Sequence, residues 1–353
     1  MQTIVSCRGA GVMKRLLSIF VSLALLALIY SKIDVARIWP VLKGGSIFWL
    51  TASFVLLLPS TMLAAWRLEQ FMPHGRKLGI LESNRLIMIA NVLNAFLPSR
   101  MGEISKAWFL KERGHLNGNL AFALVAFEKV SDLMALLLCC GFGLFFIHDK
   151  GRLFWSLAAL MSLGFLGGIA FLRSTRLADL AFATALRVGP RFIKSRVCRL
   201  QPAWAQMQAF LWRDRFRMLR IGASSLLITV LNLVQIWFLI LTLGATVPFL
   251  LSMALSPLAV FVGLLPITFA GVGTRDAALI FFYRGYLDAP TAGALGLLCT
   301  LRYFVLAFAG IPFAGQYIAV WRSGASLLPD DKSKPCAPGA ELPSLDQKSS
   351  GKS

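Results

Sequence analysis

Residues 91–132 read NVLNAFLPSRMGEISKAWFLKERGHLNGNLAFALVAFEKVSD. The stretch begins apolar, is interrupted at Leu97-Pro98, and continues into a second apolar run. Six of its charged residues lie just after the proline or inside the second apolar run, namely Arg100, Glu103, Lys106, Glu128, Lys129 and Asp132. Charges at membrane depth are costly, and proteins that retain them usually use them. The stretch therefore predicts a functional site, provided that it lies within a membrane.

The composition indicates a protein that crosses a membrane several times. Of the 353 residues, 57% are hydrophobic and 15% are charged, whereas soluble domains average about 45–50% and about 25%. A soluble protein of this composition would need an implausibly large core. The length of this chain therefore indicates how many membrane helices it can form, rather than how many soluble domains.

The net charge of +20 would also suit a nucleic-acid-binding protein, but the basic residues flank the apolar runs. In such positions they act as topology signals and contact anionic lipids. We therefore expect membrane lipids, and no nucleic acid, as partners. The six cysteines and three histidines show no metal-ligand spacing, and the sequence contains no P-loop, nucleophile elbow or HExxH motif. We expect no metal site, no cofactor and no catalytic residue.

The apolar runs predict an all-α fold of about eight transmembrane helices, with two inserts that are re-entrant or broken. Residues 1–15 form a short basic N-terminus in which Met13 is a plausible true start. The clear spans are 16–30, 46–66, 119–147, 153–172, 221–243, 248–265 and 291–321. A polar connection that begins with Arg67 follows the second of them. The inserts, 86–97 and 266–288, are short or interrupted for a membrane crossing. We expect the C-terminal tail in the cytoplasm, as we do the N-terminus, which needs an even number of crossings. One of the two inserts is therefore expected to cross.

The loop 173–220 holds eleven basic and two acidic residues, a net charge of +9. The positive-inside rule places this loop and the N-terminus in the cytoplasm. Within the loop, apolar residues recur every three or four positions, so we expect a helix that lies on the inner leaflet or packs on a partner helix. This stripe comprises Ile193, Val197, Leu200, Trp204, Met207 and Leu211. Residues 323–353 predict a disordered tail.

The two inserts resemble each other in sequence. In each, a Leu-Pro pair is followed by glycine beside charged residues, then by an Arg-Gly pair and an apolar run that bears charge. Paired interrupted segments in the two halves of a chain indicate the binding site of a transporter. Chance similarity between membrane segments is the alternative.

Glu128 and Asp132 lie four residues apart, on one face of a helix. Two such carboxylates repel each other unless a cation lies between them or one is protonated. The candidate cations are Lys106, Arg275 and Arg302. Two interpretations stay open, a polar site between the two halves of the chain and a purely structural ion-pair lock.

Arg100, Lys106 and Arg275 lie beside proline or glycine breaks. Exposed backbone N–H groups together with arginine suit a phosphate group, and a lipid headgroup is the obvious anion at this depth. The alternative is that these cations snorkel from a helix end toward water.

Three motifs, LPSRMGEISKAWFL (97–110), FEKVSDL (127–133) and LPITFAGVGTRDAAL (265–279), resemble the membrane domain of lysylphosphatidylglycerol synthases and of the wider flippase-like group. The resemblance covers about residues 13–322 and implies a flippase-like transmembrane domain over 16–322. In the second motif Thr268, Ala270 and Asp276 stand where Ser, Gly and Glu are more usual in the family, as Lys106 in the first stands for Arg.

The resemblance implies the lipid-translocating half of a synthase, because only about thirty residues follow where the synthases carry an aminoacyl-transferase domain. A separately encoded lipid-modifying enzyme would then be a partner. We expect an inner-membrane protein, not an enzyme, that binds or translocates a polar or anionic lipid. The expected headgroup groove comprises Asn94, Pro98, Arg100, Gly102, Glu103, Lys106, Glu128, Asp132, Gly271, Gly273, Arg275, Asp276 and Arg302.

Two other functions stay open. In an integral-membrane transferase or accessory subunit of lipid or envelope-glycan synthesis, the same carboxylates would serve as general bases or metal ligands. In a non-catalytic membrane scaffold, the basic loop 173–220 would bind a partner.

Overall fold

The computed structural model describes residues 35–73, 78–96, 102–113, 115–146, 151–188, 191–264 and 273–322. Within these ranges the regular structure is entirely helical. Several predictions fall on residues outside these ranges, namely those for the N-terminus (1–15), the first span (16–30) and the tail (323–353).

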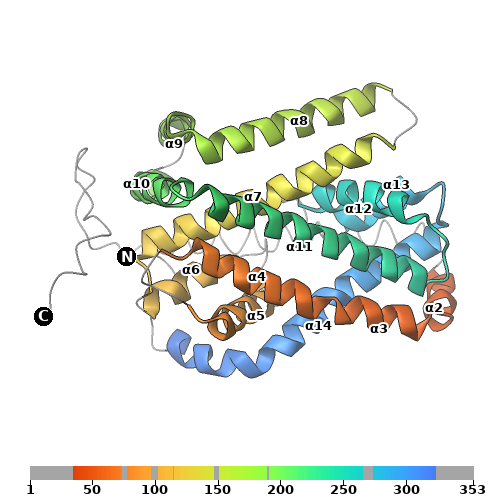
Figure 1. Ribbon diagram of the computed structural model, residues 1–353. Coiled ribbons are helices and arrows are strands. Elements are labelled where there is room, and N and C mark those ends of the chain that lie inside the picture. The colour runs from red at the N-terminus through yellow and green to blue at the C-terminus, as the bar shows by residue number, and fades with distance from the viewer. Residues whose placement is uncertain are drawn as a thin grey trace, which may run out of the picture.

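Long helices run lengthwise through the molecule as a bundle (Figure 1). They are α3 (Ile47–Val55) with α4 (Leu57–Phe71), α7 (Gly118–Leu144), α8 (Arg152–Arg173), α11 (Arg215–Thr242) and α14 (Ala289–Arg322). Four described segments are long and apolar enough to cross a membrane, namely Ile47–Phe71, Phe154–Arg173, Arg215–Thr242 and Ala289–Phe313. The predicted class, an all-α polytopic membrane protein, is confirmed.

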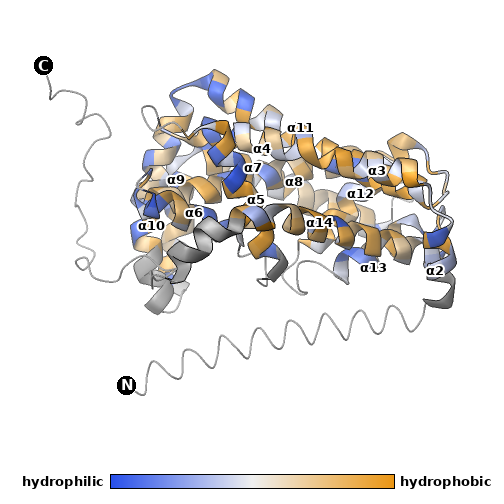
Figure 2. Ribbon diagram, turned by 90° about the horizontal axis from the view of Figure 1, so that it is seen from below, coloured by the Kyte–Doolittle hydropathy of each residue, from blue (hydrophilic) through white to orange (hydrophobic). Residues whose placement is uncertain are grey.

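Hydrophobic residues predominate along the middle of the bundle, and many hydrophilic residues lie toward its ends (Figure 2). Helix α8 is an example, because Trp155, Leu163 and Leu166 are 65%, 73% and 64% exposed. So much exposed apolar surface on one helix is expected where the surrounding medium is lipid rather than water.

Two helical hairpins occupy opposite halves of the bundle (Figure 1). The first consists of α5 (Ile80–Phe96) and α6 (Gly102–Glu112), and the second of α12 (Phe249–Gly263) and α13 (Thr274–Tyr283). They contain the two inserts that interrupt the apolar pattern of the sequence. The span expected over 248–265 corresponds to α12, the first arm of the second hairpin, which at 15 residues is shorter than the four long apolar segments.

Each hairpin packs against the long helix that follows the other one. Helix α5 packs along α14, and α12 packs along α7. A glycine permits the close approach at both contacts. A Cβ on Gly310 of α14 would lie 2.7 Å from the carbonyl oxygen of Met88 in α5, and one on Gly143 of α7 would collide with the carbonyl oxygen of Ala254 in α12. This reciprocal packing agrees with the internal repeat expected from the sequence.

The basic loop 173–220 is largely helical. Helices α9 (Thr175–Val188) and α10 (Arg191–Trp212) lie across one end of the bundle, and the chain of α2 (Val35–Lys43) lies at the other (Figure 1). The apolar stripe of α10 faces the bundle, since Trp204 and Met207 are 3% and 1% exposed. Of the two placements expected for this stripe, the described part of it therefore packs on a partner helix.

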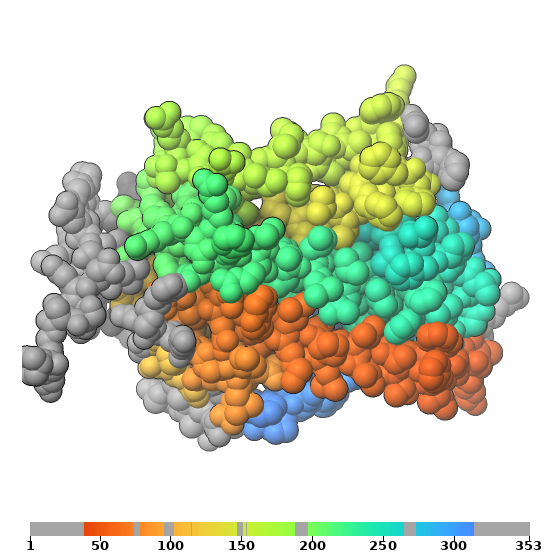
Figure 3. Space-filling view, in the orientation of Figure 1, coloured from red at the N-terminus to blue at the C-terminus, as the bar shows by residue number. Residues whose placement is uncertain are grey.

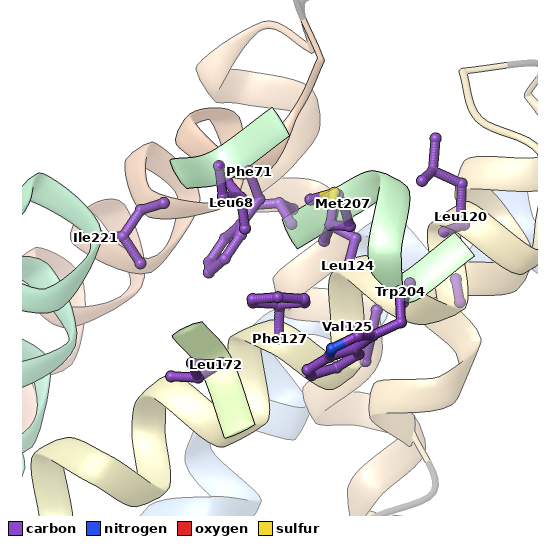
Figure 4. Packing of buried hydrophobic residues seen from close by; sticks show 14 of the residues in the cluster. Leu68, Phe71, Leu120, Leu124, Val125, Phe127, Leu172, Trp204, Met207 and Ile221 are labelled. Atoms are coloured by element: carbon purple, nitrogen blue, oxygen red, sulfur yellow. The ribbon is translucent and has the colours of Figure 1, made fainter. Parts of the chain in front are cut away.

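That partner helix is α7. The ring of Trp204 stacks on the ring of Phe127, with their centroids 4.0 Å apart, and Figure 4 shows both rings near Leu172 and Met207. Phe127 is fully buried and precedes Glu128 in the chain. The apolar packing between α7 and α10 thus fixes the part of α7 that carries the charged residues.

Candidate functional site

Arg67 lies at the centre of a buried group of ion pairs. It belongs to α4 and is 2% exposed. Its Nη2 donates to Glu128 Oε1 at 3.0 Å, and its Nη1 donates to Ser225 Oγ at 2.8 Å and to Asp132 Oδ1. The expectation that Arg67 begins a polar connection is wrong, because α4 continues to Phe71 and carries the arginine into the bundle.

Helix α6 adds a second cation to the same group. Lys106 is 3% exposed, and its Nζ lies 3.1 Å from Glu128 Oε1 and 2.6 Å from Glu103 Oε2. Lys129 of α7 lies at the more exposed side, 3.3 Å from Glu103 Oε1 and 3.4 Å from Asp132 Oδ2. We call these six residues the ion-pair network, namely Arg67, Glu103, Lys106, Glu128, Lys129 and Asp132.

The ion-pair network balances its own charge, since it contains three cations and three carboxylates. Of the three cations expected for Glu128 and Asp132, Lys106 contacts Glu128, whereas Arg275 and Arg302 belong to a separate cluster. Arg67, rather than those two arginines, pairs with Glu128 and Asp132. Arg67 contacts both carboxylates and so offsets their mutual repulsion.

Asn94 and Gly102 join the first hairpin to this network. Asn94 Nδ2 donates to Glu103 Oε1 at 3.3 Å. A Cβ on Gly102 would lie 2.6 Å from the backbone nitrogen of Asn94 and 2.7 Å from its Oδ1. Glycine at this position therefore allows α6 to start directly against α5, which brings Glu103 within reach of Asn94.

The second cluster centres on Tyr303 of α14. The guanidinium carbon of Arg275 lies 5.6 Å from the centroid of the Tyr303 ring, and that of Arg302 lies 5.3 Å from it. We call Arg275 and Arg302 the arginine pair. Arg275 is held by three further contacts from its Nη2, to Asp276 Oδ1 at 3.1 Å, to the Gly296 carbonyl oxygen at 3.2 Å and to Thr300 Oγ1 at 2.8 Å.

Gly273 and Asp276 shape the start of α13. Gly273 has a φ of +96°, a backbone conformation that residues with a side chain rarely adopt. The Gly273 N–H donates to Asp276 Oδ2 at 3.1 Å, so this carboxylate caps the N-terminus of α13. Asp276 thus holds the first turn of α13 with one oxygen and Arg275 with the other.

Arg302 has a neutral partner instead of a carboxylate. It is 7% exposed, and its Nη1 donates to Gln235 Oε1 of α11 at 2.8 Å and to the Asn232 carbonyl oxygen at 3.5 Å. Gln235 Nε2 donates in turn to the Ser53 carbonyl oxygen of α3 at 2.8 Å. Across the described ranges of the chain, no carboxylate lies within ion-pair distance of Arg302.

The ion-pair network and the arginine pair lie at different positions in the bundle. Helix α11 lies beside α3 and α4 (Figure 3) and contacts both clusters, through Ser225 and through Gln235. These two residues are ten positions apart, which corresponds to about 15 Å along a helix. The single polar cluster expected between the halves is therefore two clusters.

Three of the expected groove residues, Pro98, Arg100 and Gly271, lie outside the described residues. The others fall into the two clusters or support them. Gln235, Thr300, Tyr303 and Ser225 complete the clusters and were not expected. Gln235 carries a sequence signal, because a glutamine within an apolar run is costly unless it has a partner.

A family model described as Lysylphosphatidylglycerol synthase TM region matches residues 15–310. The matched region contains both hairpins, the ion-pair network and the arginine pair. No curated protein and no solved structure gives a significant match to the chain.

Proposed function

The chain belongs to the lysylphosphatidylglycerol synthase transmembrane-region family, and from this premise we propose that it binds a polar or anionic lipid by its headgroup and moves it between the leaflets of the cytoplasmic membrane. The observation that supports the proposal most is the burial of two charged clusters beside hairpins in opposite halves of the bundle. Interrupted segments of this kind line the substrate sites of many transporters. The family relationship supports a role connected with membrane lipids.

In the proposed mechanism, the headgroup exchanges its water shell for side chains of the two hairpins, while the acyl chains stay among the lipids. The reciprocal packing of α5 on α14 and of α12 on α7 divides the bundle into two interlocked halves. Small movements of one half against the other would open the polar clusters toward one leaflet and then the other.

We propose that α9 and α10 face the cytoplasm. The segment that contains them carries a net charge of +9, and cytoplasmic segments next to membrane helices are enriched in Lys and Arg. The end of the bundle with α2 would then face the opposite side. Protease accessibility of tags placed after residue 188 and before residue 45, in oriented membrane vesicles, tests this orientation.

The translocation proposal is tested with purified protein in liposomes that contain a lipid labelled on its headgroup. A membrane-impermeant reductant added outside bleaches the outer-leaflet label at once, and any further loss reports movement from the inner leaflet. We expect accelerated loss for at least one lipid in a panel of phospholipids, glycolipids and polyprenyl lipids. No acceleration for any of them, with folded protein in the liposomes, would rule out the proposal.

Two variants separate translocation from the other functions. Glu103→Gln and Arg275→Ala each remove a charge from one cluster, and we expect both to slow translocation. Unchanged cellular function in both variants would favour a scaffold. A requirement for a divalent metal ion, together with turnover of a lipid into a new product, would favour a transferase.

A further inference from the structure

The charges of the arginine pair are not balanced by the described side chains around them. The cluster of Arg275 and Arg302 contains one carboxylate, Asp276, which pairs with Arg275 and leaves a net charge of +1. The ion-pair network has three charges of each sign. Of the two clusters, the arginine pair is therefore the one with an excess charge.

Arg302 lies near the middle of a membrane span. The apolar segment of α14 is Ala289–Phe313, so Arg302 is about 17–20 Å along the helix from either end. This distance exceeds the reach of an arginine side chain, so the charge cannot snorkel to the interface. A cation retained at that depth is by default a functional residue with a partner.

The described side chains around Arg302 do not supply that partner. Gln235 offers Arg302 a neutral amide oxygen, and this oxygen satisfies one hydrogen bond without cancelling the charge. The sequence between α12 and α13, residues 265–272, contains no acidic residue. An anionic ligand beside Arg302 would balance this charge.

The surface beside Arg302 suits a lipid. Leu297, Leu301, Phe304 and Phe308 are 41%, 45%, 46% and 68% exposed. Their spacing of four, three and four places them on one face of α14, and Leu301 precedes Arg302 in the chain. An acyl chain can thus lie along this exposed stripe, next to the part of α14 that carries Arg302.

We propose that the arginine pair is the binding site for the phosphate group of an anionic lipid, with Arg302 as the charged anchor. Gln235 is the residue that decides specificity, because it orients Arg302 and leaves its charge available. Thr300 and Tyr303 position the two guanidinium groups. The ion-pair network, already neutral, holds the first hairpin in place and does not bind the phosphate. This inference rests on the proposed function and names the substrate class of its site.

The decisive variant is Gln235→Glu, which keeps the shape of the side chain and places a carboxylate 2.8 Å from Arg302. The new ion pair occupies the anchor. Because a charged hydrogen bond to the phosphate is lost, we expect the affinity for short-chain phosphatidylglycerol to fall at least about tenfold. The thermal stability of the variant should equal or exceed that of the parent, because the buried charge gains a partner.

The matched control is Gln206→Glu on α10, a half-buried position away from both arginines. It adds the same charge and should leave the affinity unchanged. Arg302→Gln removes the anchor instead of neutralising it, and it carries the same test if Gln235→Glu fails to fold. Equal affinity of Gln235→Glu and the parent, or of Arg302→Gln and the parent, would overturn the inference.

Binding is measured by titration of the purified protein in detergent with three probes. They are short-chain phosphatidylglycerol, a diacylglycerol with the same chains, and inorganic phosphate. We expect phosphatidylglycerol to bind most tightly. Diacylglycerol that binds equally well would overturn the role of the phosphate, and inorganic phosphate that binds equally well would overturn the role of the lipid. No transport is required, so failure of the proposed translocation is distinguishable from failure of this site.

Discussion

Replacing Arg67 by methionine should strongly destabilise the protein. Arg67 is 2% exposed and contacts Glu128 and Asp132. Without it the ion-pair network keeps two cations against three carboxylates, and Glu128, itself 2% exposed, keeps a single cation. Removal of one partner from a buried ion pair costs about 3–5 kcal/mol, and we expect this loss in the free energy of unfolding.

A surface ion pair provides the matched control. Arg113 pairs with Glu82, and the two side chains are 36% and 28% exposed. Solvent screens such a pair, so Arg113→Met should cost only about 0–1 kcal/mol. The comparison separates the effect of burial from that of removing an arginine side chain.

The second half of the test restores neutrality. Glu128→Gln alone leaves three cations against two carboxylates, whereas Arg67→Met with Glu128→Gln leaves two of each. The double variant should be more stable than the sum of the two single losses implies, by about 0.5–3 kcal/mol. Unfolding in detergent, followed by tryptophan fluorescence, is compared for five proteins: the parent, Arg67→Met, Arg113→Met, Glu128→Gln and the double variant. Additive losses, or a loss for Arg67→Met no larger than for Arg113→Met, would show that the buried ion-pair network does not stabilise the fold through its charge balance.

Two further substitutions test the packing around the network. Gly102→Ala should lower the free energy of unfolding by about 1–3 kcal/mol, because the added Cβ would lie 2.6 Å from the Asn94 nitrogen. The control in the same fluorescence assay is Gly79→Ala, because a Cβ at Gly79 meets nothing within 4 Å. Trp204→Ala removes the ring that stacks on Phe127 and should cost about 3–5 kcal/mol. An unchanged unfolding transition in Trp204→Ala would show that α10 does not support α7.

The two hairpins could be predicted from the sequence because their interruptions are local. Leu97-Pro98 and Gly271 to Gly273 break apolar runs that are short for a crossing. The residues that follow each break are polar in both cases, so the amino-acid pattern alone reveals the similarity of the two inserts. The reciprocal packing on α7 and α14 has no such local signal, since it depends on Gly143 and Gly310 and on helices far apart in the chain.

Arg67 shows why one cation of the network escaped prediction. A basic residue directly after about twenty apolar residues usually marks the end of a span. Here the helix continues for one more turn, and the signal for this is the spacing of Ala65, Leu68 and Phe71, all 0% exposed. The charge is tolerated because Glu128 and Asp132 of α7 contact it. No local sequence pattern predicts partners that lie more than sixty positions away.

The partner of Arg302 is equally hidden in the sequence. Gln235 lies 67 positions before it, in a different span. A carboxylate was the expected partner because buried charges are usually paired. The neutral amide found there is what separates the arginine pair from the ion-pair network.

We expect a phosphate-bearing lipid to cross the membrane by way of Arg302. The most direct test places the parent and Gln235→Glu in matched liposomes with headgroup-labelled phosphatidylglycerol and an impermeant reductant outside. We expect the parent to expose the inner-leaflet label rapidly and Gln235→Glu to leave it protected, as in protein-free liposomes. Equal rates for the two proteins would show that phosphatidylglycerol does not cross the membrane by way of Arg302.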